Sequence, residues 1–355
     1  REPGDPRRGG LGHAPGRKAV RRAEGPRFAG RSLHRGLRRR LAGAAFAFWS
    51  LASPAAAPEG GRPAPVLEGL GSYSLPAGTR SRQAQRWFDQ GMVMSFSFNA
   101  AESARAFEAA TRQDPSCALC WWGVAWSLGP TINADMEPAS GERVAKAIAR
   151  ARALSAKASP KARGLIAALA TRHPAGKALD EEAYERALAA LSRRFPRDAD
   201  IAVLAAEALM NLHPYDWWED DGRPKPATPE IERRLLAALK RAPSHPAALH
   251  YWIHLQESSA RPARAAAEAD RLRHLVPGSP PLTHMPAHID MRTGRYAEAV
   301  AASERAIEAD RAYLAQVDAQ GAYRVGYAAH NHHFLWAAAA MQGRSALAIE
   351  AARQA

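Results

Sequence analysis

Histidines recur in the C-terminal half of the sequence at spacings that suit a metal ion. His250 and His254 are four residues apart, and the same H-x-x-x-H pair returns at His284 and His288, 34 residues later. Residues four apart lie on one face of a helix, so each pair can direct two imidazoles to the same side. Stacked helices have axes roughly 8 to 10 Å apart. Four imidazoles from two such helices can therefore converge on one ion.

A carboxylate follows the first histidine pair on the same helical face. Glu257 lies three residues after His254, which keeps the two side chains on one side of the helix. We expect Glu257 to act as a metal ligand or as a catalytic general base toward a metal-bound water. Tyr251 stands where the zinc-protease motif H-E-x-x-H has its glutamate. Protease chemistry of that class is therefore disfavoured.

A third histidine segment, His330-Asn-His-His333-Phe-Leu, follows after a longer connection. Aligning its turn glycine, Gly343, with Gly294 of the preceding unit puts His333 level with His284, and His330 one turn earlier. The predicted metal ligands are therefore His250, His254, His284, His288, His330 and His333. Imidazole suits copper, iron and zinc alike. The pattern predicts a transition metal ion as cofactor and leaves open its identity and whether it is catalytic.

The helices that carry these residues belong to a repeat. Gly91, Phe107, Ala110 and Pro115 fall at positions 8, 24, 27 and 32 of the 34-residue tetratricopeptide pattern. Prolines recur where one helical hairpin would end, and the segments between them are rich in alanine, the best helix former. The sequence thus resembles the tetratricopeptide repeat family over most of residues 80–355. The resemblance implies an all-α fold, a right-handed superhelical solenoid of antiparallel helix pairs.

More narrowly, the three histidine segments resemble those of a group of secreted bacterial tetratricopeptide proteins that has no established activity. In the family, the first helix of each unit lines a concave groove, so the resemblance places the histidines in that groove. The competing interpretation is an interaction scaffold whose polar groove holds a peptide or protein without a metal. In that case Trp122 and Trp126 would stack on the bound peptide.

Composition and periodicity divide the chain into five segments. They are a disordered leader with a signal peptide (1–57), a linker (58–80), N-terminal repeat units (81–212), an aromatic and acidic inter-helix loop (213–230) and C-terminal histidine-rich units (231–355). A loop of that length is typical of functional insertions, but its aromatic residues could equally seal the stack. The last unit has no polar capping helix, which favours self-association through that end.

The N-terminal segment predicts export. Arginines precede an apolar stretch at 41–52, and the small residues around Ala57 offer a cleavage site. Residues 1–57 hold 13 Lys and Arg against 3 Asp and Glu, a net +10 of the chain's +14. Nucleic-acid binding is not expected, because the basic balance belongs to the leader. No later segment is apolar for long enough to span a membrane, so we expect a periplasmic or secreted protein.

Cys117 and Cys120 are the only cysteines of the chain. In an oxidising compartment, a C-x-x-C pair can form a local disulfide, exchange electrons or bind a metal. We expect a disulfide or redox pair, because no second C-x-x-C follows to complete a zinc site.

Overall fold

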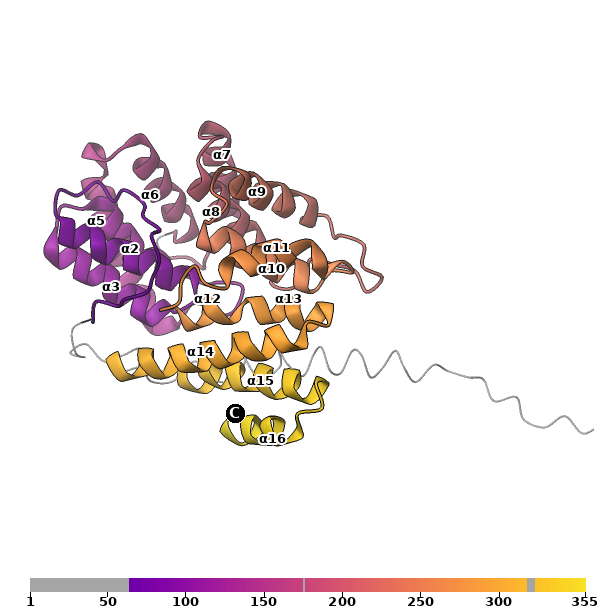
Figure 1. The fold of residues 1–355 in the computed structure, drawn as a ribbon. Helices are drawn as coiled ribbons and strands as arrows, with labels where there is room; N and C mark the ends of the chain where they lie inside the picture. Colours follow the sequence, from indigo (N-terminus) through magenta and orange to yellow (C-terminus); the bar gives the residue numbers. More distant parts are fainter. Residues whose placement is uncertain (1–63, 175, 318–322) are drawn as a thin grey trace, which may run out of the picture. The chain divides into compact units, whose positions relative to one another are not determined.

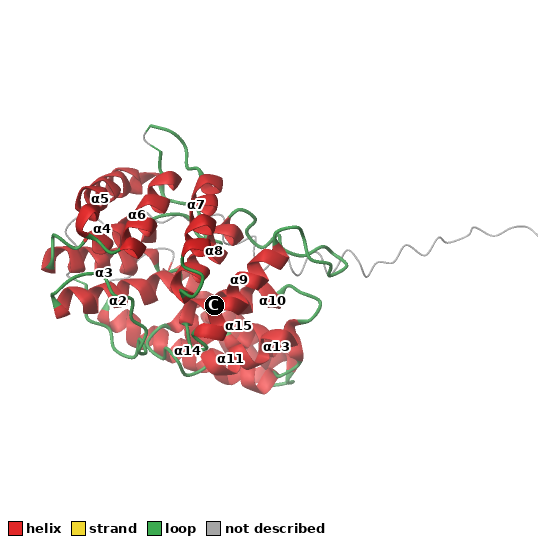
Figure 2. Cartoon of the chain, turned by 90° about the horizontal axis from the view of Figure 1, so that it is seen from above, coloured by secondary structure: helices red, strands yellow, loops and turns green. Residues whose placement is uncertain are grey.

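The computed structural model describes residues 64–174, 176–317 and 323–355, and these residues are helical without any β-strand (Figure 2). The all-α prediction is therefore confirmed. In chain order the α-helices are α2 (Arg82–Phe96), α3 (Ala100–Gln113), α4 (Ala118–Ser127), α5 (Gly141–Leu154), α6 (Pro160–Arg172), α7 (Glu181–Arg194), α8 (Ala199–Asn211), α9 (Thr228–Arg241), α10 (Pro246–Glu257), α11 (Ala266–Leu272), α12 (Pro280–His284), α13 (Pro286–Thr293), α14 (Tyr296–Gln316), α15 (Ala329–Met341) and α16 (Ser345–Gln354). The predicted leader, 1–57, lies outside the described residues.

Short polar side chains fix where many of these helices begin. The Ser81 hydroxyl accepts a hydrogen bond from the Ala84 amide at 3.1 Å at the start of α2. The Asp198 carboxylate does the same for the amide of Ile201 at 3.0 Å in α8. Such caps satisfy amides that have no partner inside the helix.

Successive helices pack against one another along the chain (Figure 1). Phe107 of α3 is fully buried at the point where α2, α3 and α4 meet. A Cβ atom on Gly91 of α2 would lie 2.8 Å from the Phe107 ring, and a Cβ on Gly123 of α4 would lie 2.3 Å from it. The two glycines therefore allow the helices to close around one aromatic ring.

We expect Gly123→Ala to lower the free energy of unfolding by about 1–3 kcal/mol, because the new methyl group overpacks a core that has no room for it. The change would otherwise favour the helix by about 1 kcal/mol. Urea denaturation measures the difference. Gly141→Ala is the matched control, because a Cβ at this helical glycine meets no atom within 4 Å. Equal stability of the two variants would contradict this account of the packing.

Segments that are far apart in the sequence pack against one another. Helix α10 packs against α2 as well as against its neighbours α9 and α11. Residues 64–80, predicted as part of a linker, are packed instead: Leu67 and Leu75 belong to the main hydrophobic core. The Gly278 amide donates to the Gly69 carbonyl at 2.8 Å, across more than 200 residues of sequence. In an open solenoid each repeat contacts only its neighbours, so these contacts depart from the predicted arrangement.

The aromatic residues singled out in the sequence are largely structural. Trp122 and Trp126 are buried and stack on each other with ring centroids 5.1 Å apart. Because they are buried, they are not placed to stack on a peptide. In the 213–230 loop, Trp217 is fully buried and the Trp218 indole donates to the Leu255 carbonyl at 2.8 Å. That loop therefore seals the end of α10, the helix that carries the first histidine pair.

A buried ionic cluster ties α6 to the helices after it. Arg172 has no exposed side-chain surface, and its guanidinium donates to Glu181 at 2.8 Å and to the Pro130 carbonyl at 2.7 Å. It also lies over the Tyr184 ring, 4.8 Å from the centroid. Burial raises the pKa of Glu207 to about 7, although Arg172 pulls that pKa down. The cluster therefore contains a carboxyl group that titrates near neutral pH.

The raised pKa of Glu207 gives the stability a pH dependence of defined sign. Between about pH 4.5 and 7, folded Glu207 keeps its proton while the unfolded chain has lost it, so stability falls as the pH rises. We expect Glu207→Gln to remove this contribution, so that its unfolding free energy falls less than that of the wild type between pH 5 and 8. Urea denaturation at both pH values measures this, and parallel pH profiles would contradict it.

No helix in the described ranges is long and apolar enough to cross a membrane.

Candidate metal site

Four helices bring the histidines together. His250, His254 and Glu257 lie on α10, and His330 lies near the start of α15. His284 and His288, expected on one helix, are divided between two: α12 ends at His284 and α13 begins two residues later at proline 286. Proline has no amide hydrogen and cannot continue the hydrogen bonding of the preceding turn. The break leaves both imidazoles in the cluster.

His284, His288 and His330 form the first group of possible ligands. One ligand atom from each lies within 4.8 Å of the others. Nε2 of His284 is 2.8 Å from Nε2 of His288, and the His330 ring centroid lies 4.8 Å from that of His284. A tetrahedral ion with bonds of about 2.0–2.1 Å separates its ligand atoms by about 3.3 Å. The three imidazoles are thus close to the spacing that one ion requires.

His254, Glu257 and His288 form the second group, which shares His288 with the first. Nδ1 of His254 donates to Oε1 of Glu257 at 2.7 Å, and Nδ1 of His288 donates to Oε2 of the same carboxylate. Glu257 therefore joins an imidazole of α10 to an imidazole of α13. Its predicted position on the histidine face of α10 is confirmed.

The hydrogen bonds fix which nitrogen of each ring carries the proton. A carbonyl or carboxylate oxygen only accepts, so each ring nitrogen that faces one must be the donor. Nδ1 of His250 donates to the Phe96 carbonyl at 2.6 Å, as Nδ1 of His254 and His288 do to Glu257. In the neutral rings, Nε2 of all three therefore carries a lone pair. Metal-binding histidines commonly show this arrangement, with the other ring nitrogen donating to an oxygen.

Burial favours the neutral form of His250, His284 and His330. It lowers the pKa of His284 and of His250 well below the usual value, and neighbouring histidines lower both further. The pKa of His330 falls to about 3, mainly through burial. Burial would raise the pKa of Glu257, but His288 and His254 outweigh it and hold the pKa below its usual value. The site therefore combines imidazole nitrogens with one carboxylate.

Nδ1 of His284 is buried and has no hydrogen-bond partner among the described residues. A buried imidazole nitrogen without a partner costs free energy. An ion held by Nε2 of His284 and Nε2 of His288 would leave this Nδ1 with its proton and still without a partner. The fit to a metal ion therefore rests on the donor set, which consists of imidazole nitrogens from α12, α13 and α15.

Aromatic side chains contact the histidine cluster on two sides. Phe334 contacts the first group, with its centroid 4.4 Å from the His284 ring. Phe98 and Tyr215 flank His254 at 5.9 and 5.8 Å. Among the described residues, the non-glycine residues with a positive backbone φ are Phe98, at 57°, and Tyr215, at 58°. A left-handed backbone conformation at a non-glycine residue costs roughly 1–3 kcal/mol and persists where the surrounding structure requires it.

His333 is not where the sequence alignment placed it. His330, rather than His333, lies beside His284, while His333 is exposed and its nearest ring contact is Trp336 at 6.5 Å. The alignment assumed that both segments were unbroken helices, but the break between α12 and α13 lies between His284 and Gly294, whereas α15 runs unbroken to Met341. His250 is buried next to His254 at 4.7 Å, outside both groups of possible ligands.

Several residues of the site could not have been found from sequence patterns. The Phe96 carbonyl is a backbone group, which any residue could supply. Phe98 lies in the three-residue connection between α2 and α3, about 150 residues before the histidines it contacts. Phe334 had a weak signal, because it follows His330 by four residues and so shares its helical face.

Cys117 and Cys120 form a disulfide at the start of α4. Both residues are buried, and Sγ of Cys117 accepts a hydrogen bond from the Cys120 amide at 3.1 Å. The two cysteines are bonded to each other, and neither belongs to either group of possible metal ligands.

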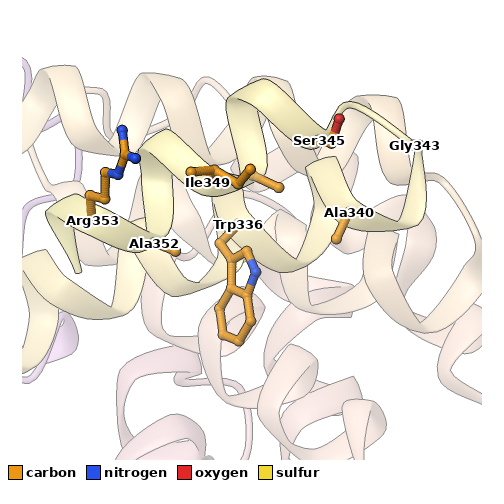
Figure 3. Close-up of a pocket in the computed structure, with 8 residues that line it drawn as sticks. Trp336, Ala340, Gly343, Ser345, Ile349, Ala352 and Arg353 are labelled. Carbon is orange, nitrogen blue, oxygen red and sulfur yellow. The ribbon is translucent and has the colours of Figure 1, made fainter.

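An open groove of about 450 Å³ lies between α15 and α16, apart from the histidines. Figure 3 shows Trp336 and Ile349 on this groove, with Arg353 near its end. Trp336 and Ile349 are about half exposed. The groove is apolar and has none of the histidines that form the cluster.

The sequence matches no model of a known protein family and no curated protein.

Proposed function

We propose that this protein binds a transition metal ion through His284, His288 and His330. The observation that carries the proposal is the convergence of three buried or half-buried imidazoles from three different helices, with two Nε2 atoms 2.8 Å apart. An all-nitrogen set of this kind suits copper, zinc and iron. Three protein ligands leave a position for water or substrate, which is the arrangement of catalytic rather than structural zinc sites.

Glu257 serves this site as an orienting group. Both of its oxygens accept hydrogen bonds from imidazoles, so in this state it is not placed to take a proton from a metal-bound water. A carboxylate behind a ligating histidine fixes the ring and strengthens it as a donor. We therefore replace the sequence-based expectation of a catalytic base by a role in holding His288.

Metal analysis of protein purified without a histidine tag tests the proposal. We expect about one equivalent of copper, zinc or iron per chain, retained after gel filtration. Metal-free protein is expected to take up one of these ions with micromolar or tighter affinity. The proposal fails if the purified protein carries no stoichiometric metal and the metal-free protein binds neither Cu²⁺, Zn²⁺ nor Fe²⁺ in titration.

We propose further that the helices form tetratricopeptide-type hairpins and that the protein works in an oxidising compartment. The glycine and phenylalanine packing around Phe107 supports the repeat. The disulfide supports the compartment, because such bonds persist in periplasmic and secreted proteins and are rare in the cytosol. The basic, apolar leader pattern points the same way.

We expect the Cys117–Cys120 disulfide to resist dithiothreitol in the folded protein and to be reduced after addition of urea. Thiol exchange needs access to a sulfur, and both cysteines are at most 2% exposed. The bond closes a very short loop, so a Cys117→Ala/Cys120→Ala variant should lose about 2 kcal/mol or less of stability. Alkylation followed by mass spectrometry measures the reduction. Rapid reduction of the native protein would instead favour a redox pair.

Self-association through the last helices is the second candidate, and the exposed Trp336 and Ile349 of the groove support it. Light scattering of wild type and Trp336→Glu tests it. We expect a concentration-dependent dimer that the substitution removes. A monomer at high micromolar concentration would rule it out.

A further inference from the structure

We propose that the cluster binds a second metal ion at His254, Glu257 and His288, and that the two ions share the ring of His288. The inference rests on the proposed function, because the first ion occupies the group that contains His284 and His330. It makes the centre dinuclear and gives Glu257 a second role, as a ligand.

The two groups approach the His288 ring at opposite nitrogens. Nε2 lies 2.8 Å from Nε2 of His284, and Nδ1 is hydrogen-bonded to Oε2 of Glu257. An imidazole that has lost both ring protons binds one ion at each nitrogen. With metal–nitrogen bonds of about 2.0–2.1 Å, ions on the two sides of the ring lie about 6 Å apart. One rigid ring therefore reaches both positions without movement of a helix.

The donors of the second position already point at one another. Oε1 of Glu257 accepts from Nδ1 of His254 at 2.7 Å, and Oε2 accepts from Nδ1 of His288. The pattern is that of ligands around a shared centre in which protons take the place of the ion. Glu257 also supplies negative charge, which the first group lacks. Its side chain is 12% exposed, so the position is not sealed from solvent.

The protons that an ion displaces have definite destinations. His254 moves its proton from Nδ1 to Nε2 and stays neutral. His288 binds the first ion through Nε2, so its Nδ1 proton leaves to solvent when the second ion binds. One proton is released for each second ion, as expected when metal binding deprotonates a ligand. Because two nearby cations repel each other, the affinity for the second ion should be at least about tenfold lower than the affinity for the first.

The competing arrangement has one ion, with Glu257 acting only through its hydrogen bonds to the histidines. The number of ions bound distinguishes the two. Metal-free protein is titrated with Cu²⁺, followed by calorimetry and by electron paramagnetic resonance, and proton release is recorded with a pH-stat. We expect two equivalents, one proton at the second step, and loss of resonance intensity as the second ion couples to the first through His288.

Variants locate the second ion. Glu257→Gln should reduce the stoichiometry from two to one, and His254→Ala should do the same. His333→Ala is the matched control and should keep two, because this histidine is exposed and outside both groups. Circular dichroism of each variant checks that the fold is retained.

Each other outcome has a separate meaning. One equivalent in the wild type, with Glu257→Gln only weakening it, overturns the second ion and leaves the proposed function standing. No binding at all overturns the proposed function. Two equivalents that persist in both Glu257→Gln and His254→Ala, with undiminished resonance intensity, place the second ion elsewhere and also overturn this inference.

Discussion

His288→Ala is expected to weaken metal binding by more than 100-fold. His288 belongs to both groups of possible ligands, and its Nε2 lies 2.8 Å from that of His284. Loss of a residue that only supports a metal ligand typically costs about 10–100-fold in affinity, so loss of a shared ligand should cost more. Competition with a chelator of known affinity measures the change.

His333→Ala is the control for this measurement. It removes an imidazole from the same histidine-rich region, but one that is exposed and has no contact with the cluster among its ring contacts. We expect wild-type affinity for the first ion. If His288→Ala and His333→Ala bound the ion equally well, the ion would not lie between α12, α13 and α15.

Arg172→Met is expected to lower the free energy of unfolding by about 3–5 kcal/mol, the usual cost of removing one partner of a buried ion pair. The arginine has no exposed surface and donates to Glu181 and to the Pro130 carbonyl. Methionine fills part of the space but leaves these acceptors, and the nearby carboxyl of Glu207, without their cation. Urea denaturation at pH 7 measures the loss.

Arg186→Met is the matched control, because Arg186 lies on α7, the helix that also carries Glu181. Its ion pair with Glu182 is largely exposed, so removal should change stability by about 0.5 kcal/mol or less. A small effect at both positions would show that the buried cluster contributes little. Metal affinity of Arg172→Met, measured in the folded state, should stay at the wild-type value, because Arg172 is not among the possible metal ligands.

The sequence predicted the helical class and much of the histidine cluster, because both follow from local spacing. Four-residue spacing put His250 and His254 on one face of α10, and Glu257 followed at the next turn. The 34-residue offset brought the His284 pair beside them. Those relations depend only on helix geometry and on the stacking of neighbours.

The features that the sequence did not predict arise from irregular helices or from contacts between residues far apart in the sequence. Proline 286 splits the second pair between α12 and α13. The same break shifts the match with α15, so that His330 rather than His333 lies beside His284. The packing of residues 64–80 against the rest of the core has no repeat pattern to reveal it. A periodic pattern predicts where regular units meet, and says little about the segments that join them.

The hydrogen bond from His250 to the Phe96 carbonyl has a consequence for folding kinetics. It joins residues 154 positions apart, and the Asn99 amide group bonds to the Tyr313 hydroxyl across 214. Contacts so far apart in sequence form slowly, because a long loop must close first. The individual hairpins can form early, but the ring of His250 acquires its partner only when α2 has docked on α10. We therefore expect the docking of α2 on α10 to appear with the slowest refolding phase, after most of the helix content has returned.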